Sequence, residues 1–590
     1  MNKCFGCCIW LTLMYSTICN SAQFNWKPGF HITPERGWLN DPHPAFSRDP
    51  KGLYHVFYQC NPNSTLPPWA PGQQDHWCHD SSEDLASWSR NPPPGIPDGS
   101  ASGSVIQLNY NGSGVAVYGI SKGVGLSISM DKDLMTWNTS SPAPIITTPS
   151  SINASYVGDP HIWQEEPSGD YMVLVGSAQG DPTKTGSIPQ ALLFNSSNLI
   201  NWEYVSTVWI GNSTLGPRAE CVDMFPITDQ LYVYIYSSPN LGKSLWFVGK
   251  MGAGYKFQTV SKGMVDYGHF YAANSFFDSH GRRIVYGWIS ESLSDDTIHK
   301  NGWAGMQSVP RVISLSPDNT LLFNPVEELS LLHGDHLGYF NQIPLPENAT
   351  YKLGGMGNQL HMVVTIMGKF SPNSKVGIFV LADENMKEYT AINIQNSDTN
   401  CNHIGQWSVG TNIPGADYTN FKVDGHDPTL CQKACCADSG CVAWTFADPQ
   451  PLLTVDYGNN SAFPCVSHET CCWLKHANRS PVPRVNCTSG TTSTQLQLEV
   501  STINSSLLPA TNVTKSSYTA QVNSHDQLVT LEIMVDKSAV EVFVNKGEAV
   551  ITSRVYPTLA SSNSVILFTE NTSAMFTVDA WVMKDAYKET

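Results

Sequence analysis

The amino-acid sequence predicts an almost all-β protein with at least two domains. Short runs rich in β-branched and aromatic residues recur, for example at 54–58, 171–175 and 231–236, and clusters of Gly, Pro, Asn and Asp separate them. Helical periodicity is nearly absent. Many short strands at close spacing are typical of sandwiches, barrels and propellers. A chain of 590 residues is also longer than one hydrophobic core usually supports.

The first 22 residues are predicted to be a signal peptide. Lys3 supplies a basic start, residues 4–19 are apolar, and the small residues Ser21 and Ala22 follow. This stretch is short for a membrane span, so we expect cleavage near Ala22, with an uncleaved anchor as the alternative. No later segment is apolar and long enough to span a bilayer. We therefore expect a secreted protein without a transmembrane segment, a vacuolar or lysosome-like compartment being the alternative.

The charge and the glycosylation motifs agree with that compartment. The formal net charge is −17 and no run of Lys and Arg occurs, so nothing in the sequence favours binding to nucleic acid. Asn-x-Ser/Thr motifs predict a glycoprotein. They occur throughout the chain, for example at Asn63, Asn111, Asn138, Asn153, Asn212, Asn348, Asn504 and Asn571.

The first domain, residues 23–337, is predicted to be a β-propeller. The pattern Asp-Leu-x-x-Trp occurs at 84–88 and again at 133–137, and 198–202 is a weaker third copy. A turn that recurs at intervals of about fifty residues is typical of successive blades, each with about four strands.

The second domain, residues 338–590, is predicted to be a β-sandwich, with strand candidates such as 362–366 and 529–535. A Cys-rich insertion interrupts it at about 401–487, where nine cysteines lie. The doublets 435–436 and 471–472 lack the Cys-x-x-Cys spacing of a zinc site, so we expect disulfides in an oxidising compartment. Their connectivity cannot be deduced from the sequence alone.

Three acidic residues lie in segments that could present a carboxylate at a strand end. Asp41 lies between Asn40 and Pro42, Asp159 precedes a proline, and Glu220 precedes Cys221. An acid beside a proline is ordinary turn chemistry when taken alone. The candidacy of these three residues therefore depends on the surrounding motifs.

In order along the chain, these segments resemble the motifs of glycoside hydrolase family 32, which comprises invertases, inulinases and related fructosyltransferases. The family opens with W-M-N-D-P, and residues 38–42 match it with Leu in place of Met. The other matches keep the family's order: F-Y-Q at 57–59, W-G-H at 77–79 with Cys for Gly, D-L-x-x-W at 84–88, F-S-G-S at 101–104 with Ala for Phe, R-D-P at 158–160 with Gly for Arg, E-C-V-D at 220–223, and later segments at 266–272, 283–288, 302–311, 535–543 and 551–557.

This resemblance implies a five-bladed β-propeller followed by a β-sandwich, with the active site in the propeller. It implies that Asp41 is the nucleophile, that Glu220 is the general acid/base, and that Asp159 holds fructose hydroxyls and stabilises the transition state. A retaining glycosidase uses two carboxyl groups about 5 Å apart, one ionised and one protonated. Crowding of acids raises the proton affinity of one of them, which we expect to be Glu220.

The resemblance also implies residues around these acids. Cys221 and Asp223 are expected to influence the acid Glu220 without contacting the substrate themselves. The expected substrate contacts, with Trp77 as a wall of the site, are Asn40, Gln59, Trp69, Trp77 and Ser102. A single Trp is nevertheless more often a core residue than a sugar platform. No cluster of residues has the spacing of a metal site, so we expect neither a metal nor an organic cofactor.

The chain departs from the family's pattern near the expected site. Gly158 replaces the family arginine, Ala101 replaces an aromatic residue, and His43 and Pro44 replace Asn-Gly after the nucleophile. The departures leave the choice between sucrose and fructan open. We consider Arg218 a candidate to replace the missing arginine.

The Cys-rich insertion, through residues 431–446 and 472–475, resembles a PAN/apple module. The resemblance implies a surface or polymer ligand, and the alternative is a disulfide-stabilised insertion with no partner. Cys401 and Cys487 are candidates to close its base. In the first domain, Cys60 and Cys78 are candidates to pair across neighbouring strands, which would leave Cys221 reduced.

The leading hypothesis is a secreted, retaining β-fructofuranosidase that hydrolyses terminal β-fructofuranosyl bonds, most readily those of sucrose. A fructosyltransferase differs only in whether water or a sugar reaches the fructosyl-enzyme. A hypothesis from another class is a carbohydrate-binding or adhesion protein that uses the insertion. The intact trio of Asp41, Asp159 and Glu220 favours the enzyme, whereas Gly158 and Ala101 favour the binding protein.

Overall fold

The computed structural model describes residues 25–587 except for several internal gaps, and the predicted signal peptide lies outside it. The gaps are 47–51, 109–111, 140–142, 166, 185, 369, 372, 397–407, 416, 424–426, 438–440, 442, 448–469, 477–481, 492–494 and 524–526. Within the described part, strands dominate, as predicted, and no helix is long and apolar enough to cross a membrane.

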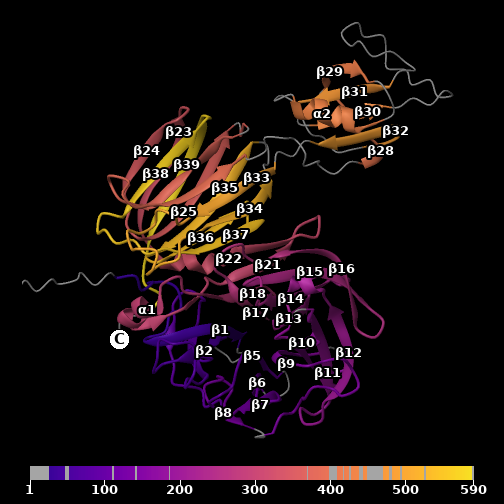
Figure 1. The fold of residues 1–590 in the computed structure, drawn as a ribbon, viewed down its shortest axis with the longest axis vertical. Helices are drawn as coiled ribbons and strands as arrows, with labels where there is room; N and C mark the ends of the chain where they lie inside the picture. The colour runs from indigo at the N-terminus through magenta and orange to yellow at the C-terminus, as the bar shows by residue number, and fades with distance from the viewer. Residues whose placement is uncertain are drawn as a thin grey trace, which may run out of the picture.

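The first region consists of five antiparallel sheets that follow one another in the chain (Figure 1). The first contains β1 (Gly37–Phe46), β2 (Tyr54–Asn61), β3 (His76–Ser82) and β4 (Ser89–Arg90), and the second β5 (Gly103–Gln107), β6 (Gly114–Ile120), β7 (Gly123–Ser129) and β8 (Trp137–Thr139). The third contains β9 (Val157–Gln164), β10 (Tyr171–Gln179), β11 (Ile188–Ser196) and β12 (Glu203–Ile210), and the fourth β13 (Glu220–Pro226), β14 (Tyr232–Ser238), β15 (Lys243–Gly252) and β16 (Lys256–Met264). The fifth contains β17 (Tyr271–Phe277), β18 (Arg283–Ile289), β20 (Met306–Gln307), β21 (Arg311–Leu315) and β22 (Leu321–Pro325).

The first strand of each sheet packs against the first strand of the next sheet. These contacts run from β1 to β5, β9, β13 and β17, and from β17 back to β1, so the five strands form a closed ring. The ring is also closed by hydrogen bonding, because β19 (Trp303–Ala304) adds to the first sheet by pairing in parallel with β1. Three short helical segments lie between strands: η1 (Ser213–Leu215), α1 (Asp295–Asn301) and η2 (Glu327–Leu332).

The second region is formed by two six-stranded sheets that enclose an aliphatic core (Figure 1). One sheet contains β23 (His333–Leu345), β39 (Ala574–Met583), β25 (Gln359–Gly368), β35 (Leu528–Asp536), β36 (Ala539–Val544) and β37 (Ala549–Arg554). The other contains β24 (Thr350–Gly355), β38 (Ser564–Glu570), β26 (Lys375–Ala382), β27 (Thr390–Gln395), β33 (Gln495–Ser501) and β34 (Ser517–Asn523). The apolar side chains alternate along these strands, which explains why each sheet buries one face.

The insertion forms a separate small sheet between β27 and β33. Its elements are β28 (Ser408–Asn412), β29 (Asp417–Lys422), α2 (Thr429–Ala437), β30 (Ala443–Ala447), β31 (Cys471–Lys475) and β32 (Val482–Thr491). Disulfides join Cys431 to Cys472 and Cys435 to Cys441, so the predicted disulfide stapling is confirmed for these pairs. Cys401, the suggested partner of Cys487, lies outside the described residues.

A buried ionic network joins the N-terminal segment and the first region to the sandwich. His31 contacts two carboxylates, with 2.8 Å from Nδ1 to Asp536 Oδ2 and 2.9 Å from Nε2 to Glu541 Oε1. Arg311 completes the network by pairing with Glu541 at 2.5 Å and with Asp266 at 3.0 Å. Because both ring nitrogens of His31 face carboxylates, the imidazolium form satisfies the network best.

This network predicts that the protein loses stability at alkaline pH. Burial alone would lower the pKa of His31, but hydrogen bonds to Asp536 and Glu541 and their charges raise it to about 9. The stabilisation is therefore complete below about pH 6.5, the ordinary value for His, and is lost as pH rises through about 9. We expect His31→Gln to lower the free energy of unfolding by about 3 kcal/mol at pH 6 and to remove this alkaline loss. Chemical denaturation between pH 6 and 9 measures both effects.

The exposed His299 offers a matched control, since His299→Gln removes a histidine without touching the network. An alkaline loss of the same size in His31→Gln as in the wild type would contradict the assignment. The acid side has a separate cause. Burial would raise the pKa of Glu541, but Arg311 and His31 lower it to about 2, so its contribution is lost as pH falls from 4.5 towards 2.

Candidate active site

Three strands of the inner ring bring the predicted acids together. Asp41 lies in β1, Asp159 in β9, and Glu220 is the first residue of β13. Cys221 connects the first two acids, because its amide donates to Asp159 Oδ2 at 3.2 Å and its thiol to Asp41 Oδ2 at 3.4 Å. Cys221 thus joins two acids that lie far apart in the sequence, and it is itself 180 positions from Asp41.

A break in strand register accompanies each acid. The pairing of β1, β9 and β13 with the next strand shifts at residues 39–42, 158–161 and 220–223. Asp159 and Cys221 have positive φ angles of 47° and 46°, which are rare for residues with a side chain. Such bulges redirect side chains and are frequent beside active sites. Here they lie where the acids meet.

The Asp41 carboxylate accepts hydrogen bonds from several polar side chains. Ser102 Oγ donates to its Oδ2 at 2.5 Å, and Asn40 Nδ2 donates to its Oδ1 at 3.2 Å. Asn40 and Ser102 also donate to Gln59 Oε1, at 2.5 and 3.1 Å. Asn40, Gln59 and Ser102 are buried, so their main contacts in this structure orient Asp41 and one another.

Burial and mutual repulsion raise the proton affinity of the acid cluster. Burial raises the pKa of Asp159 to about 8, and the charges of Glu220 and Asp41 add to the effect. Burial also raises the pKa of Asp41, although hydrogen bonds from Ser102, Asn40 and Cys221 oppose it. From the sequence we expect this effect at Glu220, whereas in the structure the pKa values of Asp159 and Asp41 are raised.

The Glu220 carboxylate has a partner on each oxygen. Arg218 contacts Oε1 through Nε at 2.6 Å and through its terminal nitrogen at 2.5 Å. Tyr271, the first residue of β17, donates its hydroxyl to Oε2 at 2.6 Å. Glu220 is thus held between its own strand and the next strand of the ring.

Cys221 and Asp223 follow Glu220 in β13, and both are buried. Cys221 is a free, buried thiol, which confirms that it stays reduced, and burial raises its pKa well above the usual value. Asp223 is fully buried and contacts Arg283 at 2.8 Å and His161 at 3.2 Å. Asp223 therefore connects β13 to β9 through His161 and to β18 through Arg283.

The two predicted tryptophans have different environments. Trp69 is 65% exposed and lies edge-on to Trp38, with ring centroids 5.7 Å apart, and near Trp288. It remains available to a ligand. Trp77 is only 2% exposed, because its ring stacks on His43 and its indole N–H donates to the carbonyl of residue 101. The structure thus corrects the prediction that Trp77 forms a wall of the site and places it in the core.

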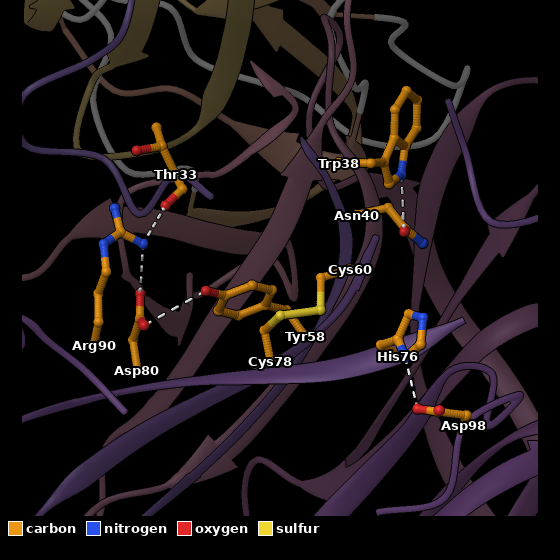
Figure 2. Close-up of a disulfide and its surroundings, with 10 residues drawn as sticks. All are labelled: Thr33, Trp38, Asn40, Tyr58, Cys60, His76, Cys78, Asp80, Arg90 and Asp98. Atoms are coloured by element: carbon orange, nitrogen blue, oxygen red, sulfur yellow. Dashed lines mark hydrogen bonds and ion pairs between the residues drawn. A yellow bond between two sulfur atoms is a disulfide. The ribbon is translucent and has the colours of Figure 1, made fainter. Parts of the chain in front are cut away.

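A disulfide clamps the strands that carry Gln59 and Trp77. Cys60 and Cys78 are joined as predicted, and Gln59 and Trp77 face each other in the adjacent register position of β2 and β3. Figure 2 shows the Cys60–Cys78 bridge beside Tyr58, together with the hydrogen bond from the Trp38 indole to Asn40. The bridge closes residues 61–77, which include Trp69.

Removal of this bridge by a Cys60→Ser/Cys78→Ser double substitution is expected to lower the free energy of unfolding by about 3 kcal/mol, because a loop of this length gains that much entropy in the unfolded chain. We also expect a higher KM for the substrate, since Trp69 lies in the released loop. Chemical denaturation and steady-state kinetics measure the two effects. Unchanged stability and KM would show that strand pairing alone holds the loop.

Several residues of this site cannot be recognised from the sequence. Tyr271 lies in one of the matching segments at 266–272, yet that match does not reveal its contact with Glu220. Asp75 accepts a hydrogen bond from Gln59 Nε2 at 3.0 Å, and burial and the charge of Asp41 raise its pKa to about 6. Tyr156, three residues before Asp159, donates to Asp159 Oδ2 at 3.4 Å. Among the described residues, no group of His, Cys, Asp and Glu could hold a metal ion.

Comparison with known proteins places this geometry in a family. The chain is 26% identical to an insoluble β-fructofuranosidase isoenzyme from Arabidopsis thaliana over 97% of this chain and 98% of that protein. It is 30% identical to a sucrose-6-phosphate hydrolase from Zymomonas mobilis over 52% of this chain and 63% of that protein. Its fold is similar to that of fructan 1-exohydrolase IIa from Cichorium intybus, with a TM-score of 0.69 at 19% identity, covering 96% of this chain and 99% of that one.

Two family profiles cover most of the described chain. Residues 31–325 match the N-terminal domain of the glycosyl hydrolases family 32, and residues 341–582 match the C-terminal domain of the same family. The first match includes Asp41, Asp159 and Glu220. The chain is therefore a member of the glycosyl hydrolases family 32 and a glycoside hydrolase.

Proposed function

We propose that this protein is a secreted, retaining β-fructofuranosidase that hydrolyses terminal β-D-fructofuranosyl bonds and prefers sucrose. The observation that carries the proposal is the convergence of Asp41, Asp159 and Glu220 around Cys221. Paired carboxylates are what the hydrolysis of a glycosidic bond requires. The β-fructofuranosidases and sucrose-6-phosphate hydrolases among its relatives support the substrate class.

In the first step, the Asp41 carboxylate attacks C2 of the fructosyl unit while Glu220 donates a proton to the departing oxygen. The bond between C2 and that oxygen breaks, and a fructosyl ester with Asp41 forms. In the second step, Glu220 takes a proton from water, whose oxygen attacks C2. The bond between C2 and the Asp41 oxygen breaks, which releases fructose and restores the carboxylate. Ser102 and Asn40 keep the Asp41 carboxylate oriented for both steps.

Asp159 is proposed to bind fructose hydroxyls and to stabilise the transition state. Its pKa, raised to about 8, keeps Asp159 protonated at neutral pH. That proton removes one negative charge from the cluster and thereby favours the ionised form of Asp41. A protonated Asp159 can also donate a hydrogen bond to a sugar hydroxyl as well as accept one.

We propose the same organisation for the chain that the sequence predicts. The five sheets of the first region would be the five blades of a propeller domain that spans 23–337, and the closed ring of first strands supports this. The sandwich domain would span 338–590, with a PAN/apple-like insertion at about 401–487 that binds a surface or polymer. We propose secretion with removal of a signal peptide from the N-terminal sequence, and glycosylation from the Asn-x-Ser/Thr motifs. The similarity to plant insoluble isoenzymes supports an extracellular location.

Release of glucose and fructose from sucrose by the purified mature chain tests the proposed function. We expect equal amounts of the two sugars. An excess of glucose over fructose would show transfer to another sugar and hence a fructosyltransferase. Binding of sucrose or fructan without turnover of either would instead support the carbohydrate-binding alternative.

A further inference from the structure

Arg218 occupies the outer side of the candidate acid/base. Its side chain is 33% exposed and that of Glu220 is 17% exposed, and the two form a tight pair through Oε1. The two donors, Nε and a terminal nitrogen, belong to one edge of the guanidinium plane and converge on the same oxygen, so they hold Oε1 in place. A lysine could supply the charge but not this planar edge.

The absence of a side chain at position 158 is what makes this arrangement possible. A Cβ atom added to Gly158 would lie 2.1 Å from the hydroxyl oxygen of Tyr156 and 2.5 Å from the ring carbon that bears it. Tyr156 therefore occupies the space beside Asp159, and the Arg218 guanidinium lies over its ring at 5.8 Å. Tyr156 thus needs the missing side chain at Gly158, and its ring faces Arg218.

The contacts of Glu220 also distinguish its two oxygens. A guanidinium can only donate hydrogen bonds, so Oε1 must accept them. A proton on Oε1 would point at a donor and is therefore excluded. The transferable proton therefore belongs on Oε2, whose partner, the Tyr271 hydroxyl, can accept as well as donate. Arg218 in this way selects the oxygen that carries the proton.

We infer that Arg218 is a positioning residue that holds Glu220 so that Oε2 delivers its proton to the leaving group. Gly158 is the structural condition for this role, because any side chain there displaces Tyr156 from beneath Arg218. The inference rests on the proposed function of Glu220 as the acid/base. Proton transfer needs the carboxyl oxygen and the leaving-group oxygen within hydrogen-bond distance. If Arg218 no longer holds Glu220, we therefore expect much of the acid catalysis to be lost.

The test compares two substrates that share the fructosyl unit and whose leaving groups differ in their need for a proton. Sucrose releases an alkoxide-like sugar oxygen and needs the acid, whereas 4-nitrophenyl β-D-fructofuranoside releases a stable phenolate and does not. For Arg218→Met we expect kcat on sucrose to fall by about 10²-fold, the effect of a misplaced catalytic group, and kcat for fructosylation by the nitrophenyl substrate to change by about threefold or less. Arg218→Lys should lie between these values, since it keeps the charge without the planar edge.

Two further variants separate positioning from general damage. Gly158→Ala should reproduce the selective loss on sucrose, because its Cβ displaces Tyr156. Arg36→Met removes an exposed arginine and should leave both substrates unaffected. Equal losses on both substrates in Arg218→Met, or no loss on either, would overturn the inference. A wild-type protein that cleaves neither substrate would instead overturn the proposed function.

Discussion

Asp41→Asn is expected to lower kcat on sucrose by about 10⁴-fold or more, which is the largest effect that we predict for any substitution in this protein. The amide has nearly the shape of the carboxylate but cannot attack C2, so no fructosyl-enzyme forms. Ser102 and Cys221 both donate to the present carboxylate, and both can donate to the amide oxygen instead. The fold and sucrose binding should therefore persist. Assays of sugar release measure kcat, and calorimetric titration with sucrose measures the affinity.

The exposed Asp229 provides the matched control, since Asp229→Asn removes the same charge far from the described contacts of the site. We expect wild-type kinetics from that variant. Asp41→Asn with more than about one hundredth of the wild-type kcat would exclude Asp41 as the nucleophile, because a residual rate of that size exceeds what binding alone supplies.

Glu220→Gln is the second large effect, with an expected fall in kcat on sucrose of about 10²- to 10⁴-fold. The loss should be much smaller in the fructosylation step with 4-nitrophenyl β-D-fructofuranoside, whose departure needs no proton. Deglycosylation then becomes limiting, because no base activates water. Azide needs no such base, so it should accelerate turnover of the nitrophenyl substrate and yield a fructosyl azide with retained configuration.

A fructosyl azide of inverted configuration would contradict the covalent intermediate, and an equal loss on both substrates would contradict the acid/base role. Tyr271→Phe gives a graded comparison, since it removes only the hydroxyl that donates to Glu220 Oε2. We expect it to retain more activity than Glu220→Gln on sucrose.

Much of this fold could be predicted because its signals are local. Strand runs such as 171–175 and the turn pattern at 84–88 each depend on a few neighbouring residues, and the matched motifs follow the chain order of the sheets. The three acids could be predicted for the same reason, since each lies within a short matching segment. The Cys60–Cys78 bridge could be anticipated because neighbouring strands carry its two ends.

The contacts that could not be predicted join residues far apart in the sequence. One partner of His31 is Glu541, and no local pattern connects residues 510 positions apart. Trp77 is of a residue type that often stacks on sugars, yet it is buried and stacks on His43. Nor does the sequence show that Tyr156 fills the space above Gly158, because that depends on which way a bulged strand turns its side chains.

The position of the insertion has a consequence for how this enzyme can be remodelled. The chain leaves the sandwich after β27 and returns at β33, and these two strands are antiparallel neighbours, with Gln395 opposite Gln497. A tight hairpin could join them without changing the register of the sheet. The Cys-rich sheet is thus an insertion that could be exchanged without changing the two strands that flank it, β27 and β33. Another module could be grafted there while the catalytic residues stay unchanged.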